Sequence, residues 1–202
     1  MEIVGLPTPV FCGVDWAEGH HDIALVEAGG KQLAKVRISD AGVRQAQAHG
    51  WDTCLILTPA AATWWEPRMG ELEKLTGHPV RSRYKLPWEK DALPKADAML
   101  VAPLSCTSLN KWGNGIADTV ALGLVSEGVH MGVPVVAMPY FNQEQGAQLA
   151  VARSIADLRS QGVLFLDGPG GYESHPPKQG NAAGFPWHLA LNAVGAIVSP
   201  AS

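Results

Sequence analysis

The sequence predicts an α/β fold in which parallel strands are joined by helical crossovers, preceded by an antiparallel β meander. From about residue 40 onward, short apolar runs of strand length alternate with segments of helical periodicity. Each apolar run is followed by turn residues and then by a helix, which is the order that a parallel sheet requires. The first 40 residues lack this alternation and are typical of consecutive strands.

The N-terminal segment contains three predicted strands, of which the last two flank Gly29 and Gly30, a pair typical of a tight hairpin. We therefore expect an antiparallel meander within residues 1–40, placed before an α/β domain that spans residues 41–202. The three predicted strands are Phe11–Trp16, Asp22–Glu27 and Gln32–Ile38.

The rest of the chain supplies the alternating elements. The predicted strands are apolar or β-branched runs bounded by turn residues: Thr53–Leu57, Ala98–Val101, Val133–Ala137 and Val163–Leu166. The predicted helices combine one-face apolar spacing with helix start or stop signals: Ala41–His49, Pro59–Trp65, Ile116–His130, Asn142–Ser160 and Trp187–Val198. Residues 167–184 are rich in Gly, Pro, Ser and Asn, and we expect them to form a mobile loop or flap.

A candidate ligand site lies in residues 96–118, ADAMLVAPLSCTSLNKWGNGIAD. A buried strand ends there at Pro103 and passes into small, donor-rich residues, among them Ser105, Thr107 and Ser108. Open α/β sheets bind ligands just beyond the carboxyl ends of their strands. We therefore expect this loop to line the site.

Composition limits the classes of function. Charged residues make up 17% of the chain and apolar residues 47%, which indicates a surface partly covered by ligand or by other subunits. A net charge of −4, without clustered Lys and Arg, argues against nucleic acid as a partner. The three cysteines form no metal-ligand pattern, and their odd number indicates reduced thiols in the cytoplasm. No apolar run is long enough to cross a membrane, and no export signal is evident.

Several motifs occur in order from about Gly42 to Val198: TPAAATWW at 58–65, LTGHPV at 75–80, the 96–118 segment, GVPVVAMPYFN at 132–142 and FPW at 185–187. On these motifs the chain resembles the flavoprotein superfamily that includes the homo-oligomeric flavin-containing cysteine decarboxylases. The resemblance implies a Rossmann-like, flavodoxin-like parallel sheet with helices on both faces. It also implies bound FMN and assembly into trimers or multiples of trimers.

The resemblance further implies which residues contact the cofactor. Near the FMN phosphate it places Thr58, Pro59 and Ala60, at a helix start where backbone N–H groups favour an anion. Without the resemblance, the same residues form an ordinary strand-to-helix turn. Around the flavin it places the loop residues Pro103, Ser105, Cys106, Thr107 and Ser108, and it gives Asn142 a possible contact with substrate. Lys111 and Asp118 also fit the pattern, but they fit equally well as a surface lysine and a helix-stabilising carboxylate.

Three departures argue against the best-known reaction of that family, phosphopantothenoylcysteine decarboxylation. The position of the family's catalytic His corresponds to about Glu89, and no His lies between His78 and His130. Residues 167–184 contain no Cys and offer only Tyr172, Glu173, Ser174 and His175 as polar candidates. Thr107 replaces an Asn of the family pattern. The resulting hypothesis is an FMN-dependent lyase or oxidoreductase whose substrate the sequence does not identify, since a flavin supplies the redox step itself.

The N-terminus departs from the family as well, because no Gly-rich turn that would receive the FMN phosphate precedes Ala41. Residues 11–40 instead resemble the start of an insertion-sequence transposase with an RNase-H-like catalytic domain, in which Asp15 would be a metal-binding carboxylate. Two-metal chemistry needs several converging carboxylates, and no matching set follows. His20 and His21 are adjacent on a strand and point to opposite faces, so we expect no metal. A non-catalytic oligomer without FMN and a transposase-related protein remain the alternatives.

Overall fold

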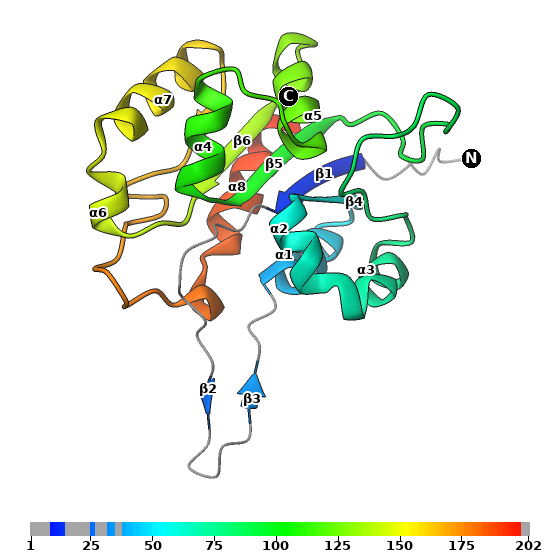
Figure 1. The fold of residues 1–202 in the computed structure, drawn as a ribbon, viewed down its shortest axis with the longest axis horizontal. Helices are drawn as coiled ribbons and strands as arrows, with labels where there is room; N and C mark the ends of the chain where they lie inside the picture. Colours follow the sequence, from blue (N-terminus) through cyan, green and yellow to red (C-terminus); the bar gives the residue numbers. More distant parts are fainter. Residues whose placement is uncertain (1–8, 15–24, 27–31, 35–37, 199–202) are drawn as a thin grey trace.

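The computed structural model describes residues 9–14, 25–26, 32–34 and 38–198 (Figure 1). Its centre is a sheet of five strands in the order β4-β1-β5-β6-β7, in which every neighbouring pair is parallel. The strands are β1 (Pro9–Val14), β4 (Asp52–Leu57), β5 (Ala98–Leu104), β6 (Val135–Pro139) and β7 (Leu164–Phe165). The predicted parallel sheet with helical crossovers is confirmed.

The first strand does not belong to an antiparallel meander, so that part of the prediction was wrong. β1 lies between β4 and β5 and runs parallel to both, with Cys12 opposite Leu55 on one side and Leu100 on the other. Among the described strands, only β2 (Leu25–Val26) and β3 (Gln32–Ala34) pair antiparallel, in a separate two-stranded sheet. A short apolar run fits either kind of pairing, because its sequence does not identify its neighbours. The domain boundary at residue 40 stays a prediction. β1 precedes this boundary but lies in the same sheet as β4, β5, β6 and β7, which follow it.

Helices cover both faces of the sheet (Figure 1). One face packs against α1 (Ile38–Ala48), α3 (Met69–Thr76) and α8 (Trp187–Val198). The other packs against α4 (Cys106–Gly113), α5 (Val120–His130) and α7 (Leu149–Ser160). Alternate residues of β5 serve the two faces, since Leu100 lies in the first core and Met99 packs against the second.

Several elements differ from the predicted ones at their ends. β5 continues through the cis peptide Ala102–Pro103 to Leu104, so Pro103 lies inside the strand and does not end it. The helix expected from Ile116 begins at Val120, because the Thr119 hydroxyl accepts the N–H of Leu122 and caps it. The helix expected over 142–160 is divided into α6 (Gln143–Gly146) and α7.

Shorter elements complete the described chain: α2 (Pro59–Trp65), η1 (Glu66–Arg68) and η2 (Ala182–Gly184). α2 agrees with its predicted bounds, whereas α3 was not predicted. Trp187, at the start of α8, packs its ring against α1 so closely that a Cβ on Gly42 would lie 2.7 Å from it. Glycine at position 42 thus permits the close approach of α1 and α8.

Candidate functional site

Three turns at one edge of the sheet have the same construction. The carboxyl ends of β4, β5 and β6 lead into helices whose N-caps are Thr58, Ser105 and Asn142. Each side-chain oxygen accepts a backbone N–H three residues later, at 3.4, 3.2 and 2.9 Å respectively. Since the strands are parallel, all three caps lie at the same edge, where open α/β sheets bind ligands.

The first of these turns presents a backbone donor. Pro59 has no N–H, and the N–H of Ala61 is bound by the hydroxyl of Thr58, which is buried. The geometry of a helix start leaves the N–H of Ala60 without an intrahelical acceptor. Ala60 is also small, so its side chain leaves room at the helix end for a ligand.

The second turn is helical and is not the loop that the sequence predicted. Ser105 is the buried N-cap of α4, and Cys106, Thr107 and Ser108 form its first turn. Ser108 gives its N–H to the Ser105 hydroxyl, so Cys106 and Thr107 carry the N–H groups without intrahelical acceptors. Thr107 is the exposed member of the turn. The residues form a helix because serine is a strong N-cap, so the hydroxyl cluster begins α4.

Cys106 is a structural thiol. Its Sγ donates to the carbonyl of Gln145 at 3.9 Å and accepts from Nδ2 of Asn110 at 3.6 Å. Burial raises the pKa of the Cys106 thiol, and burial together with the Asp52 carboxylate raises that of Cys54 to about 12. The contact with Gln145 also places the start of α4 beside α6.

Both thiols are expected to resist alkylation in the folded protein. The thiolate is the reactive form, and a raised pKa keeps it scarce at about pH 8. Peptide mass spectrometry after iodoacetamide treatment should find Cys54 and Cys106 unmodified in buffer and modified in denaturant. Rapid modification of Cys106 in buffer would show an activated thiol.

The side-chain oxygen of Asn142 caps helix α6. This oxygen, Oδ1, accepts the N–H of Gln145, and Oε1 of Gln145 accepts the N–H of Asn142 at 3.2 Å, which completes a capping box. The Asn142 amide nitrogen is therefore the part of this side chain that remains for a substrate. The neighbouring Tyr140 donates its N–H to the carbonyl of Leu104 at 2.9 Å, which places the end of β6 beside the end of β5.

Nζ of Lys111 and Oδ2 of Asp118 form an ion pair at 2.7 Å on the surface. This contact agrees with the interpretation of Lys111 as a surface lysine and of Asp118 as a structural carboxylate. Glu89, at the position of the family's catalytic His, forms an ion pair with Arg83 at 2.8 Å and accepts the N–H of Leu86. The bond to Arg83, followed by the bond from Leu86, lowers the pKa of Glu89 to about 2. Glu89 is therefore an ionised structural carboxylate and does not replace the missing base.

The Glu89 ion pair predicts a pH dependence of stability. Because its pKa falls from about 4.5 to about 2 on folding, Glu89 stabilises the fold above about pH 4.5, and this contribution disappears as the pH falls toward 2. Melting temperatures of wild type and Glu89→Gln should differ at neutral pH and converge across that window. A difference that stays constant down to pH 2 would contradict the assignment.

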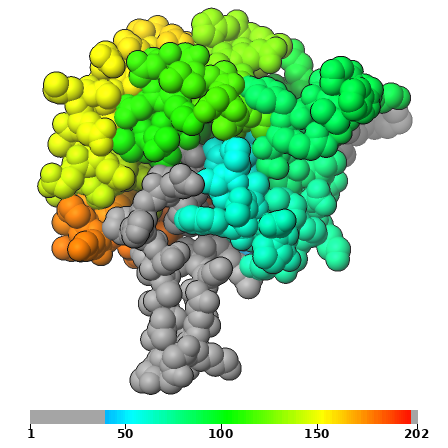
Figure 2. All heavy atoms as spheres, in the orientation of Figure 1, coloured from blue at the N-terminus to red at the C-terminus, as the bar shows by residue number. Residues whose placement is uncertain are grey.

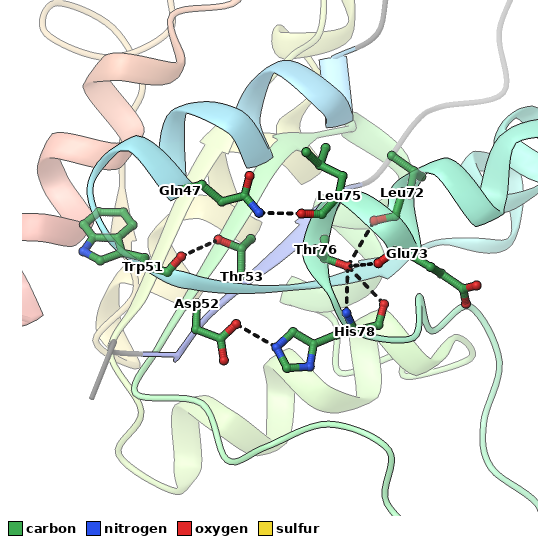
Figure 3. Close-up of polar contacts among 9 residues, drawn as sticks. All are labelled: Gln47, Trp51, Asp52, Thr53, Leu72, Glu73, Leu75, Thr76 and His78. Atoms are coloured by element: carbon green, nitrogen blue, oxygen red, sulfur yellow. Dashed lines mark hydrogen bonds and ion pairs between the residues drawn. The ribbon is translucent and has the colours of Figure 1, made fainter. Parts of the chain in front are cut away.

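The LTGHPV motif lies away from this edge. Asp52 begins β4, at the end opposite Thr58, and accepts a bond from Nε2 of His78 at 2.7 Å (Figure 3). The Thr76 hydroxyl donates to the carbonyl of Leu72, and Gln47 donates to the carbonyl of Leu75. These contacts hold α3 to β4 and α1, so the motif serves the fold.

The α2 and α4 turns share one face of the molecule, with α2 in cyan and α4 in green in Figure 2. β1 lies between their strands, so the two turns are two strand spacings apart, about 10 Å. Residues 15–24, which follow β1 and include Asp15, His20 and His21, lie outside the described residues. Within the described part of the chain, no cluster of three or more His, Cys, Asp or Glu residues is arranged to hold a metal. None of the described helices has the length and apolar character needed to cross a membrane.

The model of the Flavoprotein family matches residues 35–193, and the chain belongs to this family. Solved structures with a similar fold include the cypemycin decarboxylase CypD (16% identity, TM-score 0.61, 95% of this chain and 93% of that one) and HAL3 from Cryptococcus neoformans (16%, 0.60, 95% and 96%). The FMN-dependent cysteine decarboxylase SpaF is also similar (20%, 0.56, 94% and 98%). At these identities the likeness shows the fold, and it confirms the Rossmann-like sheet with helices on both faces.

The N-terminal resemblance is also confirmed. A stretch of 31 residues is 64% identical to a mini-circle putative transposase for IS117 from Streptomyces coelicolor. It covers 15% of this chain, and the chain spans only 8% of that transposase.

The carboxyl edge of the sheet, at the starts of α2 and α4, has hydrogen-bond donors and a charge that suit a flavin with a phosphate group. The starts of α2 and α4 present backbone N–H groups, which favour an anion. The two turns, Thr58–Ala60 and Ser105–Ser108, contain no acidic side chain that would repel a phosphate.

Proposed function

We propose that this chain is an FMN-binding flavoprotein whose cofactor lies at the carboxyl edge of the sheet. The observation that carries the proposal is the set of capped helix starts at the carboxyl ends of three strands of one parallel sheet, β4, β5 and β6, within a chain of the Flavoprotein family. The residues that would hold FMN are Thr58, Pro59, Ala60, Pro103, Ser105, Cys106, Thr107 and Ser108.

These residues would contact different parts of FMN according to their positions. The N–H of Ala60 and the dipole of α2 would hold the phosphate, and the first turn of α4 would donate hydrogen bonds to the flavin ring. Bound flavin supplies hydride and electron transfer. The amide nitrogen of Asn142 would bind a polar group of the substrate.

The reaction belongs to the lyase or oxidoreductase class, with an unassigned substrate. Phosphopantothenoylcysteine decarboxylation is disfavoured because Glu89 is held in an ion pair with Arg83 and residues 167–184 contain no Cys. An assembly of subunits, a trimer or a multiple of it, is part of the proposal, as is a cytoplasmic location. Exposed apolar side chains between α3 and β5, Leu86 and Trp88, support an assembly.

The second candidate is a non-catalytic oligomer without FMN. It is favoured by the sequence DWAEGHH, which follows β1 where the family has a Gly-rich turn. A transposase role has less support, because only residues of the N-terminal stretch match one.

An absorbance spectrum of the purified protein separates the two candidates. The proposal predicts flavin bands in the protein as purified or after addition of FMN and removal of the excess. Folded protein that remains colourless after this treatment would support the cofactor-free oligomer.

A further inference from the structure

A chain of hydrogen-bonded side chains joins α7, α4 and α6. Both polar atoms of the Asn110 amide take part in it: Oδ1 accepts the hydroxyl of Ser154 at 3.1 Å, and Nδ2 donates to Sγ of Cys106 at 3.6 Å. Sγ in turn donates to the carbonyl of Gln145 at 3.9 Å. The chain therefore runs from the middle of α7, through two residues of α4, to α6.

Both ends of this chain are held in place. Ser154 is fully buried, and α7 approaches α4 so closely that a Cβ on Gly113 would lie 2.5 Å from the Cβ of Ser154. At the other end, the capping box of α6 binds Gln145 to Asn142 in both directions. Figure 1 shows α7 beside α4, with α6 leading into α7. Asn110 thus lies between two fixed supports.

The three donors of the chain point the same way. Ser154 donates to Asn110, Asn110 donates to Cys106, and the Cys106 thiol donates to Gln145. Hydrogen bonds in such a series polarise one another and become stronger. The carboxamide suits its place because it accepts at one atom and donates at the other. An ionised aspartate has the same shape but only accepts, and leucine does neither.

The chain connects two parts of the proposed site. Cys106 begins α4, whose first turn would donate to the flavin ring, and Asn142 is the N-cap of α6. Beyond the ends of β5 and β6, the bond from Sγ to Gln145 joins the two helices. A flavin reacts with its substrate only at close range, so the two turns have to keep a fixed separation.

We propose that Asn110 is a positioning residue, which fixes the first turn of α4 relative to the cap of α6 through Sγ of Cys106. The purpose of this positioning rests on the proposed function, whereas the positioning itself is a property of the chain alone. It gives the Cys106 thiol the role of a link between helices.

Asn110→Asp tests the link without changing the size of the side chain. The new carboxylate still accepts the Ser154 hydroxyl, but it cannot donate to Sγ, and it competes with the Gln145 carbonyl for the thiol proton. Without any ligand, amide hydrogen exchange of residues 142–147 is expected to become about two- to tenfold faster, as loss of one hydrogen bond predicts. Mass spectrometry or NMR measures this rate.

Asn114→Asp is the matched control. It adds the same charge one turn later on α4, at an exposed residue whose amide donates to the Asn110 carbonyl. The amides of β5 serve as the internal reference, because a general loss of stability would accelerate them as well. Unchanged exchange in Asn110→Asp, or equal acceleration in Asn114→Asp or in β5, would overturn the proposal.

Ser154→Ala tests the other end of the chain without adding a charge. It removes the hydroxyl that holds Oδ1 of Asn110, so the amides of residues 142–147 are expected to exchange faster than in wild type, by a smaller factor than in Asn110→Asp. Unchanged exchange would overturn the part of the chain that reaches α7.

Flavin binding gives a readout that general loosening of the fold would not produce. Because α2 would hold the phosphate and α4 the ring, Asn110→Asp is expected to weaken binding of FMN and of riboflavin by the same factor, about two- to tenfold. Its charge alone would weaken FMN more, since riboflavin has no phosphate. Fluorescence titration with each flavin measures both factors, and unequal factors or unchanged binding would overturn the role of Asn110 in the flavin site.

The two kinds of measurement separate this inference from the proposed function. Wild-type protein that takes up neither flavin, while Asn110→Asp accelerates exchange in α6, would contradict the proposed function alone. Flavin uptake with unchanged exchange in α6 would contradict this inference alone.

Discussion

Cys12→Pro is expected to destabilise the fold strongly. Cys12 lies in the middle of β1, with β4 on one side and β5 on the other. Proline removes a ladder hydrogen bond and places a ring against a neighbouring strand, and it is confined to edges and bulges of sheets for this reason. A loss of about 3 kcal/mol or more is expected, by analogy with proline in helix interiors, and a typical domain has only about 5–15 kcal/mol in total.

Circular dichroism and thermal melting measure this effect. Cys12→Ala is the matched control, because it changes the same side chain and keeps the backbone N–H. We expect Cys12→Ala to melt close to the wild-type temperature and Cys12→Pro to melt at least about 6–12 °C lower, or to show no cooperative transition. A Cys12→Pro protein with the wild-type melting temperature would mean that the transposase-like segment is not part of the central sheet.

Ala60→Asp is expected to weaken FMN binding at least tenfold, or by about 1.4 kcal/mol. The new carboxylate would stand in the first turn of α2, where the phosphate is proposed to bind. The same substitution favours the helix, because an acidic residue near an N-terminus interacts well with the helix dipole, by about 0.3–1 kcal/mol. Binding and stability should therefore change in opposite directions.

Flavin fluorescence titration and thermal melting provide the two readouts. Thr63→Asp adds the same charge one turn later on an exposed position of α2, and it should bind FMN nearly as well as wild type. If Ala60→Asp and Thr63→Asp bind FMN equally well, the phosphate does not lie at the start of α2.

The parts of the fold that the sequence predicted correctly depend on local signals. Thr53–Leu57 and Ala98–Val101 are apolar runs of strand length, and Pro59 at the first helical position marks the start of α2. The division between α6 and α7 was missed because the capping box at Asn142 and Gln145 is compatible with one long helix as well as with a short one.

The parts that were missed depend on contacts between distant residues. The residues of β1 do not indicate that their neighbours are β4 and β5, which follow about 40 and 90 residues later. In the site, the edge was predicted from the strand ends, but the packing of Tyr140 against Tyr172 and His175, with ring centroids 5.2 and 5.4 Å away, was not. A tyrosine and a histidine in a Gly- and Pro-rich segment carry no signal that they pair, because their contact is set by how that segment packs against α6.

A crystal structure of the protein after addition of FMN shows directly where the cofactor binds. We expect isoalloxazine and phosphate density at the carboxyl edge of the sheet, against Thr58–Ala60 and Ser105–Ser108. Well-ordered crystals with these turns free of density at saturating FMN, or with flavin bound at another place, would contradict this expectation.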